Sequence, residues 1–318
     1  MIRRFDVALP HGITLACRAA GTPGASRVML LHGFPEAAFV WDEVMARLAP
    51  VADCVAPNLR GYPGSSAPAD VAAYRSRQLV ADVAAIISVL GGPLDLLVAH
   101  DWGGALAWNL AAAQPGLMKR LLIINAPHPA AFLRELLTSP AQQAASAYMN
   151  FLCRPDADAL LAEGDFARLW PFFGGAAWLT DAVRAQYRSA WHNDGRGLTG
   201  PLNYYRASPL RPPSGPDDPV QTLLLPDAAV TVQVPTTVLW GEGDAALLPG
   251  LLDGLERWVP DLHVQREPGA THWIVHEQPR RVAEVITSLL RPALIKLPAT
   301  EPASPGSQRT APPGGSER

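Results

Sequence analysis

The stretch Leu94-Asp95-Leu96-Leu97-Val98-Ala99-His100-Asp101-Trp102-Gly103-Gly104 decides the fold. Its first half, Leu94–Ala99, is almost continuously apolar, as in a strand that is buried on both faces of a parallel sheet. The residues that follow the stretch, Ala105–Ala113, predict a helix. A strand, a tight turn containing Gly103 and a helix, in this order, expose the central side chain of the turn above the sheet, and that side chain is Asp101.

The same alternation of apolar strands and helices extends to both sides of this unit. Further strands are predicted at Val28–His32, Val51–Pro57, Leu121–Ile124, Thr236–Trp240 and His263–Arg266. Helices are predicted for the stretch with Val40, Val44 and Leu48 on one face, for Leu79–Leu90, for Leu251–Val259 and for Arg281–Leu290. Because the strands are apolar throughout and helices follow them, we predict an α/β fold with a mostly parallel sheet flanked by helices.

This alternation stops between about Pro127 and Val230, where the chain is rich in Trp, Tyr and Pro and has no good run of strands. We therefore expect a core of residues 1–126 and 231–292, with a helical cap of residues 127–230 inserted after the fourth of these core strands. Ligands of open α/β sheets bind at the carboxyl ends of the strands, so the cap would cover the site. Residues 293–318, rich in Pro, Ser and Gly, predict a disordered tail.

Composition and charge argue against several classes of function. The 318 residues are 48% hydrophobic and 17% charged, which is enough to bury a large core. A formal net charge of −3 with scattered basic residues gives no electrostatic case for binding nucleic acid or an anionic membrane. No run approaches the roughly 18–20 apolar residues of a membrane-spanning helix. An odd number of widely spaced cysteines favours a reducing compartment, so we expect a cytoplasmic protein, as a monomer or a homodimer.

The position of Asp101 predicts the chemistry. It is that of a nucleophile elbow, whose central residue is usually Ser and whose flanking residues, here Ala99 and Gly103, must be small. A Ser that attacked a saturated carbon would form an ether, whereas a carboxylate forms an ester that water can cleave. An Asp nucleophile therefore predicts substitution at sp³ carbon, either the opening of an epoxide or the displacement of a halide. A turn Asp without a catalytic task is the structural alternative.

Such a nucleophile needs a base that activates water and an acid that orients the base, in the chain order nucleophile, acid, base. The predicted base is His272, in a loop of small residues after the last strand, with His276 as its nearest rival. The fourth strand is followed by Asn125, which is no acid. The acid is therefore expected after the next strand, at Asp244, with Glu242 as the rival.

Cleavage of the ester needs backbone donors for the oxyanion. One is the N–H of Trp102, directly after the nucleophile. The other is the N–H of Phe34, in the loop that follows the first core strand. Pro35 is a candidate for a cis peptide bond, which would help to aim this amide.

These motifs resemble those of the epoxide hydrolases of the α/β-hydrolase fold family, from about Val7 to Leu290. The resemblance rests on His32–Glu36, Arg60–Tyr62, Ser65–Pro68, His100–Gly104 and Gly269–Trp273. Ala99, in place of the usual elbow glycine, and Pro63 are departures. The resemblance implies that two cap tyrosines, Tyr148 and Tyr205, bind the epoxide oxygen. Spacing alone leaves the choice open among Tyr148, Tyr187, Tyr204 and Tyr205.

The predicted function is the hydrolysis of a small apolar epoxide to a vicinal diol through a hydroxyalkyl ester of Asp101. A phenol with a pKa near ~10 can donate to the alkoxide that ring opening generates. No metal or organic cofactor is implied. The predicted catalytic residues are Asp101, His272, Asp244, Tyr148 and Tyr205, with the amides of Phe34 and Trp102 as the oxyanion hole.

Other functions stay open. Haloalkane dehalogenases share the Asp-Trp-Gly turn, but their second halide donor is usually Asn or Trp, and the Phe34 position looks unsuited. Fluoroacetate dehalogenases carry arginines beside the nucleophile, where this chain has Trp102 and Ala105. An esterase is disfavoured because the elbow lacks Ser or Cys. A non-catalytic ligand receptor is an alternative from another class, because a fold does not determine a function.

Overall fold

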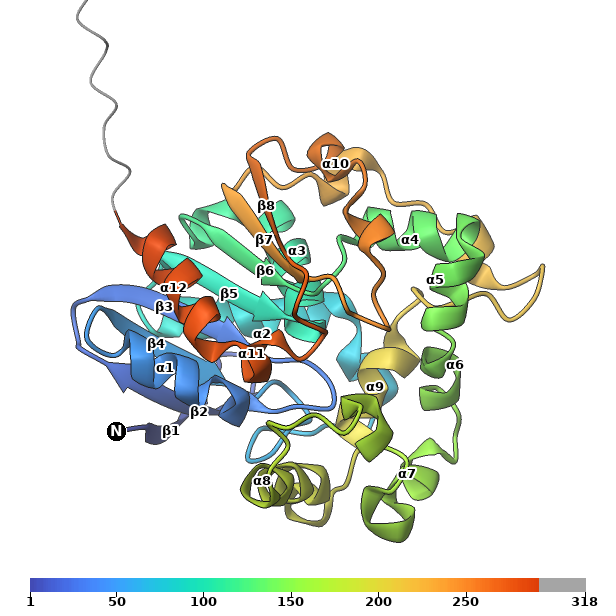
Figure 1. The fold of residues 1–318 in the computed structure, drawn as a ribbon, viewed down its shortest axis with the longest axis horizontal. Coiled ribbons are helices and arrows are strands. Elements are labelled where there is room, and N and C mark those ends of the chain that lie inside the picture. Colours follow the sequence, from blue (N-terminus) through green and yellow to red (C-terminus); the bar gives the residue numbers. More distant parts are fainter. Residues whose placement is uncertain (292–318) are drawn as a thin grey trace, which may run out of the picture.

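The computed structural model describes residues 1–291 (Figure 1). Eight strands form one sheet in the order β1-β2-β4-β3-β5-β6-β7-β8. β1 and β4 are antiparallel to β2, and all other neighbours are parallel, so the predicted mostly parallel sheet is confirmed. The predicted tail, residues 293–318, lies outside the described residues. The strands are β1 (Arg3–Ala8), β2 (Thr14–Gly21), β3 (Ser26–Leu31), β4 (Ala52–Pro57), β5 (Leu96–His100), β6 (Leu121–Ile124), β7 (Thr236–Gly241) and β8 (Leu262–Glu267).

Helices cover both faces of the sheet, and successive residues of the central strand β5 show why. Leu96 and Val98 pack into the cluster that contains α1 and α12, whereas Leu97 and Ala99 pack into the cluster that contains α2 and α3. Since side chains alternate between the faces of a strand, a strand covered on both faces must be apolar throughout. The core helices are α1 (Asp42–Leu48), α2 (Ser76–Val89), α3 (Trp102–Ala113), α11 (Ile274–Glu277) and α12 (Pro279–Leu290).

All described regular elements between β6 and β7 are helices, and Figure 1 shows most of them on the side to which the parallel strands point. The chain crosses from core to helices directly after β6, as the change in sequence pattern predicts. These helices therefore lie over the edge of the sheet at which Asp101 lies. They are α4 (Pro129–Thr138), α5 (Pro140–Ala145), α6 (Tyr148–Leu152), α7 (Ala157–Phe166), α8 (Asp181–His192), α9 (Thr199–Ala207) and α10 (Asp227–Val230).

Two parts of the core differ from the sequence analysis. The antiparallel strands β1 and β2 were not predicted, because β1 is a mostly exposed edge strand and carries charged side chains instead of an apolar run. The predicted helix Leu251–Val259 is wrong. The chain forms two short 3-10 turns there, separated by an extended Asp253 and by Gly254 with φ +70°. The apolar residues at helical spacing are buried by these turns without a continuous helix.

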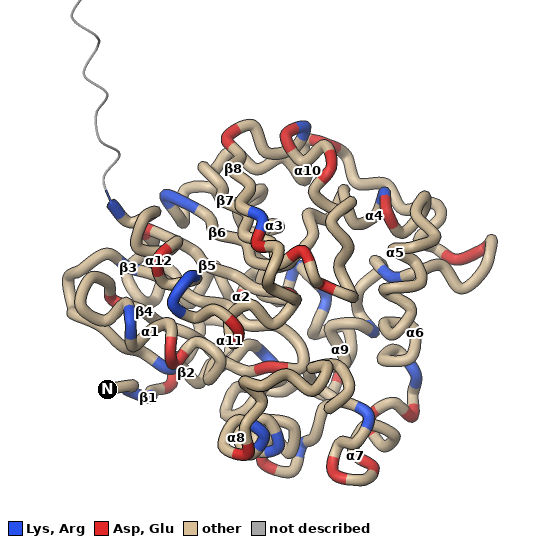
Figure 2. The backbone as a smooth tube through the Cα atoms, in the orientation of Figure 1, with Lys and Arg blue, Asp and Glu red and all other residues tan. Residues whose placement is uncertain are grey.

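Figure 2 shows that charged residues of both signs are spread over the described part of the chain, without a large patch of one sign. This distribution agrees with the small net charge of −3. Within residues 1–291 no helix combines the length and the apolar character needed to cross a bilayer.

Candidate active site

The nucleophile elbow places Asp101 between the end of β5 and the start of α3, with φ 49° and ψ −121°. Residues other than glycine rarely adopt positive φ, and such strain is common at functional sites. The surroundings force small residues at two neighbouring positions. A Cβ at Gly33 would lie 2.1 Å from Oδ1 of Asp101, and a Cβ at Gly103 would lie 2.7 Å from the carbonyl oxygen of His32. The glycines thus let the carboxylate approach the loop after β3.

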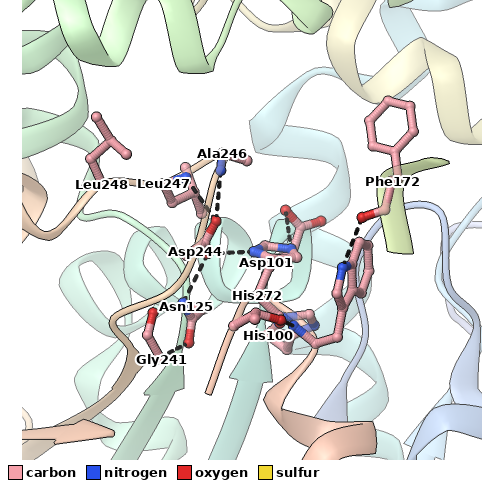
Figure 3. Close-up of polar contacts among 12 residues, drawn as sticks. His100, Asp101, Asn125, Phe172, Gly241, Asp244, Ala246, Leu247, Leu248 and His272 are labelled. Carbon is pink, nitrogen blue, oxygen red and sulfur yellow. Dashed lines mark hydrogen bonds and ion pairs between the residues drawn. The ribbon is translucent and has the colours of Figure 1, made fainter. Parts of the chain in front are cut away.

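Asp101, His272 and Asp244 lie in one line (Figure 3). Nε2 of His272 lies 3.7 Å from Oδ2 of Asp101, and Nδ1 of His272 lies 2.6 Å from Oδ2 of Asp244. Asp244 follows β7 and His272 follows β8, so the carboxyl ends of neighbouring parallel strands bring the three residues together. This is the relation of nucleophile, base and acid that the sequence predicted, with the imidazole between two carboxylates.

The charges around His272 determine its protonation. Burial alone would lower the pKa of His272, but the charge and hydrogen bond of Asp244 and the charge of Asp101 outweigh it and raise the pKa to about 9. Burial would likewise raise the pKa of Asp244, yet the charge and hydrogen bond of His272 leave it below the usual range. At neutral pH His272 is therefore an imidazolium between two carboxylates.

Hydrogen bonds from three further groups fix the carboxylate of Asp244 in addition to its contact with His272. Its Oδ1 accepts hydrogen bonds from the N–H groups of Ala246 at 2.8 Å and Leu247 at 2.9 Å, and its Oδ2 accepts one from Nδ2 of Asn125 at 2.8 Å. The Asn125 side chain also receives the N–H of Gly241 at 2.8 Å. Asn125 was excluded as an acid by its residue type, and its role as a hydrogen-bond partner of Asp244 was not predicted. Its position at the carboxyl end of β6 was the available signal.

The two expected oxyanion donors both lie beside Asp101. The N–H of Phe34 donates to Oδ1 of Asp101 at 2.7 Å. Trp102 is the first residue of α3, where a backbone N–H has no partner inside the helix. The peptide bond between Phe34 and Pro35 is cis, as predicted.

The hydroxyl contacts separate the four candidate tyrosines. The hydroxyl of Tyr187 bonds with Glu36 at 3.0 Å and with His276 at 2.8 Å, and that of Tyr204 donates to the carbonyl of Arg60 at 2.9 Å. Tyr148 and Tyr205, whose ring centroids lie 6.2 Å apart, line both cavities that contain Asp101, whereas Tyr204 lines only one of them. Burial, assisted by nearby negative charge, raises the pKa of both phenols, so both stay protonated. The structure thus places the two implied tyrosines above the nucleophile.

The comparisons with known proteins agree with this geometry. The model of the α/β-hydrolase fold family matches residues 26–279. The chain is 33% identical over 289 residues to the AB hydrolase superfamily protein YfhM of Bacillus subtilis, a match that covers 88% of this chain and 96% of the relative. It is 31% identical over 289 residues to epoxide hydrolase 3 of Xenopus tropicalis, covering 88% of this chain and 75% of the relative. The chain belongs to the epoxide hydrolases of the α/β-hydrolase fold.

Solved structures of epoxide hydrolases have the same fold as this hydrolase. One from metagenomes of hot environments has a TM-score of 0.82 and 35% sequence identity, covering 92% of this chain and 99% of that one. The epoxide hydrolase of Bacillus megaterium, solved in complex with an inhibitor, has a TM-score of 0.81 and 29% identity, covering 90% of this chain and 99% of that one.

The rivals of the base and the acid lie elsewhere in this hydrolase. Nε2 of His276 contacts Tyr187 and lies 3.3 Å from Oε1 of Glu36. Glu242 forms an ion pair with Arg266 at 3.2 Å, in which both side chains are about one-third or more exposed. Neither His276 nor Glu242 therefore belongs to the line of side chains that runs from Asp101 through His272 to Asp244.

A second buried network lies behind the nucleophile and was not predicted. Nδ1 of His100 lies 3.0 Å from Oε2 of Glu36, and Nε2 of His100 lies 2.9 Å from the carbonyl oxygen of His272. Burial would raise the pKa of Glu36, but hydrogen bonds from His100 and His276 hold it well below its usual range. A charged Glu36 thus ties the loop of Phe34 to the loop of His272. The available signal was that two polar side chains, Glu36 and His100, belong to the motifs in an otherwise apolar part of the sequence.

Two cavities meet at Asp101, and Tyr148 and Tyr205 line both. The leucine cavity, of about 210 Å³, lies over α2 and α3 and has no charged side chain except Asp101. The histidine cavity, of about 470 Å³, lies under the loops after β7 and β8. The leucine cavity is lined by Leu79, Leu106, Phe132, Met149, Leu210 and Leu225, among others. The histidine cavity is lined by Asp244, Thr271, His272, Glu277, Phe172 and Ala176, among others.

Proposed function

We propose that this chain hydrolyses apolar epoxides to vicinal diols through a hydroxyalkyl ester of Asp101. In the first half-reaction Oδ2 of Asp101 attacks a ring carbon, and the carbon–oxygen bond of the ring breaks. Oδ1 is held by the N–H of Phe34 at 2.7 Å, which leaves Oδ2 as the attacking atom. The protonated hydroxyls of Tyr148 and Tyr205 hold the ring oxygen and supply the proton that the alkoxide needs.

In the second half-reaction water attacks the ester carbonyl while His272 accepts its proton. The bond from the acyl carbon to Oδ2 then breaks, His272 gives the proton to the departing alkoxide, and the diol leaves. The proton released when Asp101 ionises again replaces the one that the tyrosine lost to the ring oxygen. His272 must be neutral when water attacks, although its pKa in the free protein is raised to about 9. Conversion of Asp101 to an uncharged ester removes one of the charges that raise this pKa. Alkylation therefore lowers the pKa of His272 and prepares it as a base. Asp244 orients the ring and stabilises the imidazolium, and the amides of Phe34 and Trp102 stabilise the oxyanion.

The observation that carries this proposal is a carboxylate, rather than a hydroxyl, at the elbow, with His272 at 3.7 Å and two cavity tyrosines beside it. A halide leaving group needs no proton and would give Tyr148 and Tyr205 no task. The relatives named as epoxide hydrolases also disfavour a dehalogenase, and the assembled residues disfavour a ligand receptor.

The leucine cavity supports an apolar substrate arm, since burial of apolar surface favours binding by roughly 25 cal/mol per Å². We propose that residues 127–230 act as the cap, because they supply Tyr148 and Tyr205. A cytoplasmic location stays a prediction from composition, and the sequence does not decide between a monomer and a homodimer.

The test is the mass of intact His272→Gln protein after incubation with a panel of epoxides and haloalkanes. Without the base the first half-reaction proceeds and the ester accumulates, so we expect a mass gain equal to one whole epoxide. The matched control is His272→Gln/Asp101→Asn, which should gain nothing. A gain equal to an alkyl group without its halide, with none from epoxides, would refute the proposal in favour of a dehalogenase.

A further inference from the structure

Gln142, in α5, is a fully buried glutamine that the proposed chemistry does not use. Its amide lies between two segments that carry catalytic side chains. Nε2 donates to the carbonyl of Ala246 at 2.8 Å and to Oγ of Ser146 at 2.8 Å, and Oε1 accepts the N–H of Leu248 at 2.9 Å. Because a buried polar group that lacks a partner is unfavourable, the Gln142 amide holds each of these partners in place.

The first of these segments is the loop of the predicted acid, which Figure 3 shows from Asp244 to Leu248. From one side, Oδ1 of Asp244 binds the N–H groups of Ala246 and Leu247. From the other side, Gln142 binds the carbonyl of Ala246 and the N–H of Leu248. The loop is thus held between the carboxylate that orients His272 and an amide from the cap.

The second segment leads to Tyr148. Ser146, which is also fully buried, accepts from Gln142 through its hydroxyl, and its own N–H donates to the carbonyl of Gln142 at 2.9 Å. Its carbonyl accepts the N–H of Met149 at 3.0 Å. These bonds fix the turn between α5 and α6, and Tyr148 is the first residue of α6.

We infer that Gln142 is a positioning residue that holds the loop of Asp244 and the segment of Tyr148 in register with each other. An amide side chain carries a donor group and an acceptor oxygen on separate atoms, which suits the carbonyl of Ala246 and the N–H of Leu248. One buried side chain thereby links a group of the first half-reaction to a group of the second. The inference rests on the proposed function for the roles of Tyr148 and Asp244.

The test compares Gln142→Met, which keeps the length of the side chain but loses its hydrogen bonds, with the neighbouring Gln143→Ala. Gln143 is the matched control because its amide donates only to the carbonyl of Leu136, inside the cap. The rates of ester formation and ester cleavage are measured separately by rapid quench with an epoxide that the wild type turns over. We expect Gln142→Met to slow each step by about tenfold, since sub-ångström misplacement is costly, and Gln143→Ala to slow neither.

A second readout does not depend on turnover. A looser loop weakens the pairing of Asp244 with His272, so an NMR titration of free Gln142→Met should give His272 a pKa below that of the wild type. A merely structural glutamine would change thermal stability and leave this pKa and both rates unchanged, and that result would overturn the inference. A wild type that forms no ester with any epoxide would refute the proposed function, while the titration would still decide on Gln142.

Ser146→Ala tests the contact toward Tyr148 separately from the contacts with the loop of Asp244. It also replaces Gln142→Met as the test variant if that variant does not fold. It removes the hydroxyl that Gln142 binds on the side of Tyr148 and leaves the contacts with Ala246 and Leu248. We expect slower ester formation with an unchanged pKa of His272. An unchanged rate of ester formation in folded Ser146→Ala would contradict the link to Tyr148.

Discussion

The leucine cavity and the histidine cavity share Asp101 and two tyrosines, and they differ in everything else that matters for the reaction. His272, Asp244 and Glu277 line only the histidine cavity, whereas all of the lining leucines belong to the other. The leucine cavity suits an apolar part of the substrate because of its lining and not because of its volume. It is the smaller of the two, at about 210 Å³ against about 470 Å³. Under the proposed mechanism one nucleophile therefore serves two environments, an apolar one for the substrate arm and a polar one for the water that His272 activates.

The tyrosines belong to both cavities, so their removal should have the largest effect that leaves the nucleophile intact. We expect Tyr148→Phe or Tyr205→Phe to slow ester formation by about a hundredfold, because the ring oxygen loses a donor as its bond breaks. Rapid quench with one epoxide measures this rate. The amount of ester at steady state should fall below that of the wild type. A rise in steady-state ester would instead place the tyrosines in the second half-reaction.

A matched pair of bulky substitutions tests the difference between the cavities directly. Leu210→Trp narrows the leucine cavity and Ala176→Trp narrows the histidine cavity, and both residues are half-buried. We expect Leu210→Trp to lower kcat/KM about tenfold for epoxides with a long apolar arm, with little change for a small epoxide. Ala176→Trp should slow ester cleavage and let the ester accumulate. The same defect in both variants would show that the cavities are not specialised.

The smallest expected effect is a shift in pH dependence. Ester cleavage needs neutral His272, so its rate should rise with pH and level off above the pKa of His272. In the ester the charge of Asp101 is gone, so the midpoint should lie below the pKa of about 9 in the free protein, by about one unit. Single-turnover cleavage rates give the first value and an NMR titration of free protein gives the second. Equal values would mean that Asp101 does not act on His272 through its charge.

The sequence predicted those features that depend on neighbours along the chain. Asp101, Asp244 and His272 each follow a strand of the parallel sheet, and such positions meet at one edge wherever the strands pair in order. β1 was not predicted because an exposed edge strand does not have to consist of apolar residues. The helix predicted at Leu251–Val259 is wrong because two short turns can bury apolar residues that have the spacing of a helix.

Features that depend on partners far along the chain could not be predicted. Gln142 contacts Leu248, which is 106 residues away, and nothing in its local sequence marks it. Spacing alone does not distinguish Tyr148 from Tyr204. In the structure the Tyr204 hydroxyl donates to the carbonyl of Arg60, whereas Tyr148 lines both cavities at Asp101. The residue type of Asn125 excludes it as the acid. The same amide can donate a hydrogen bond to the acid, and this role depends on Asp244, which lies far along the chain.

The hydrogen bond from Phe34 to Oδ1 of Asp101 makes the two oxygen atoms of the nucleophile inequivalent. Water attacks the acyl carbon, so Oδ2 departs with the diol, and an oxygen from the solvent takes its place in the side chain. If the bond prevents rotation of the carboxylate, Oδ1 belongs permanently to the protein, whereas the other oxygen is replaced in every cycle. In water enriched in ¹⁸O, the first diol would thus carry an unlabelled oxygen from the protein itself, and the second diol would carry the label.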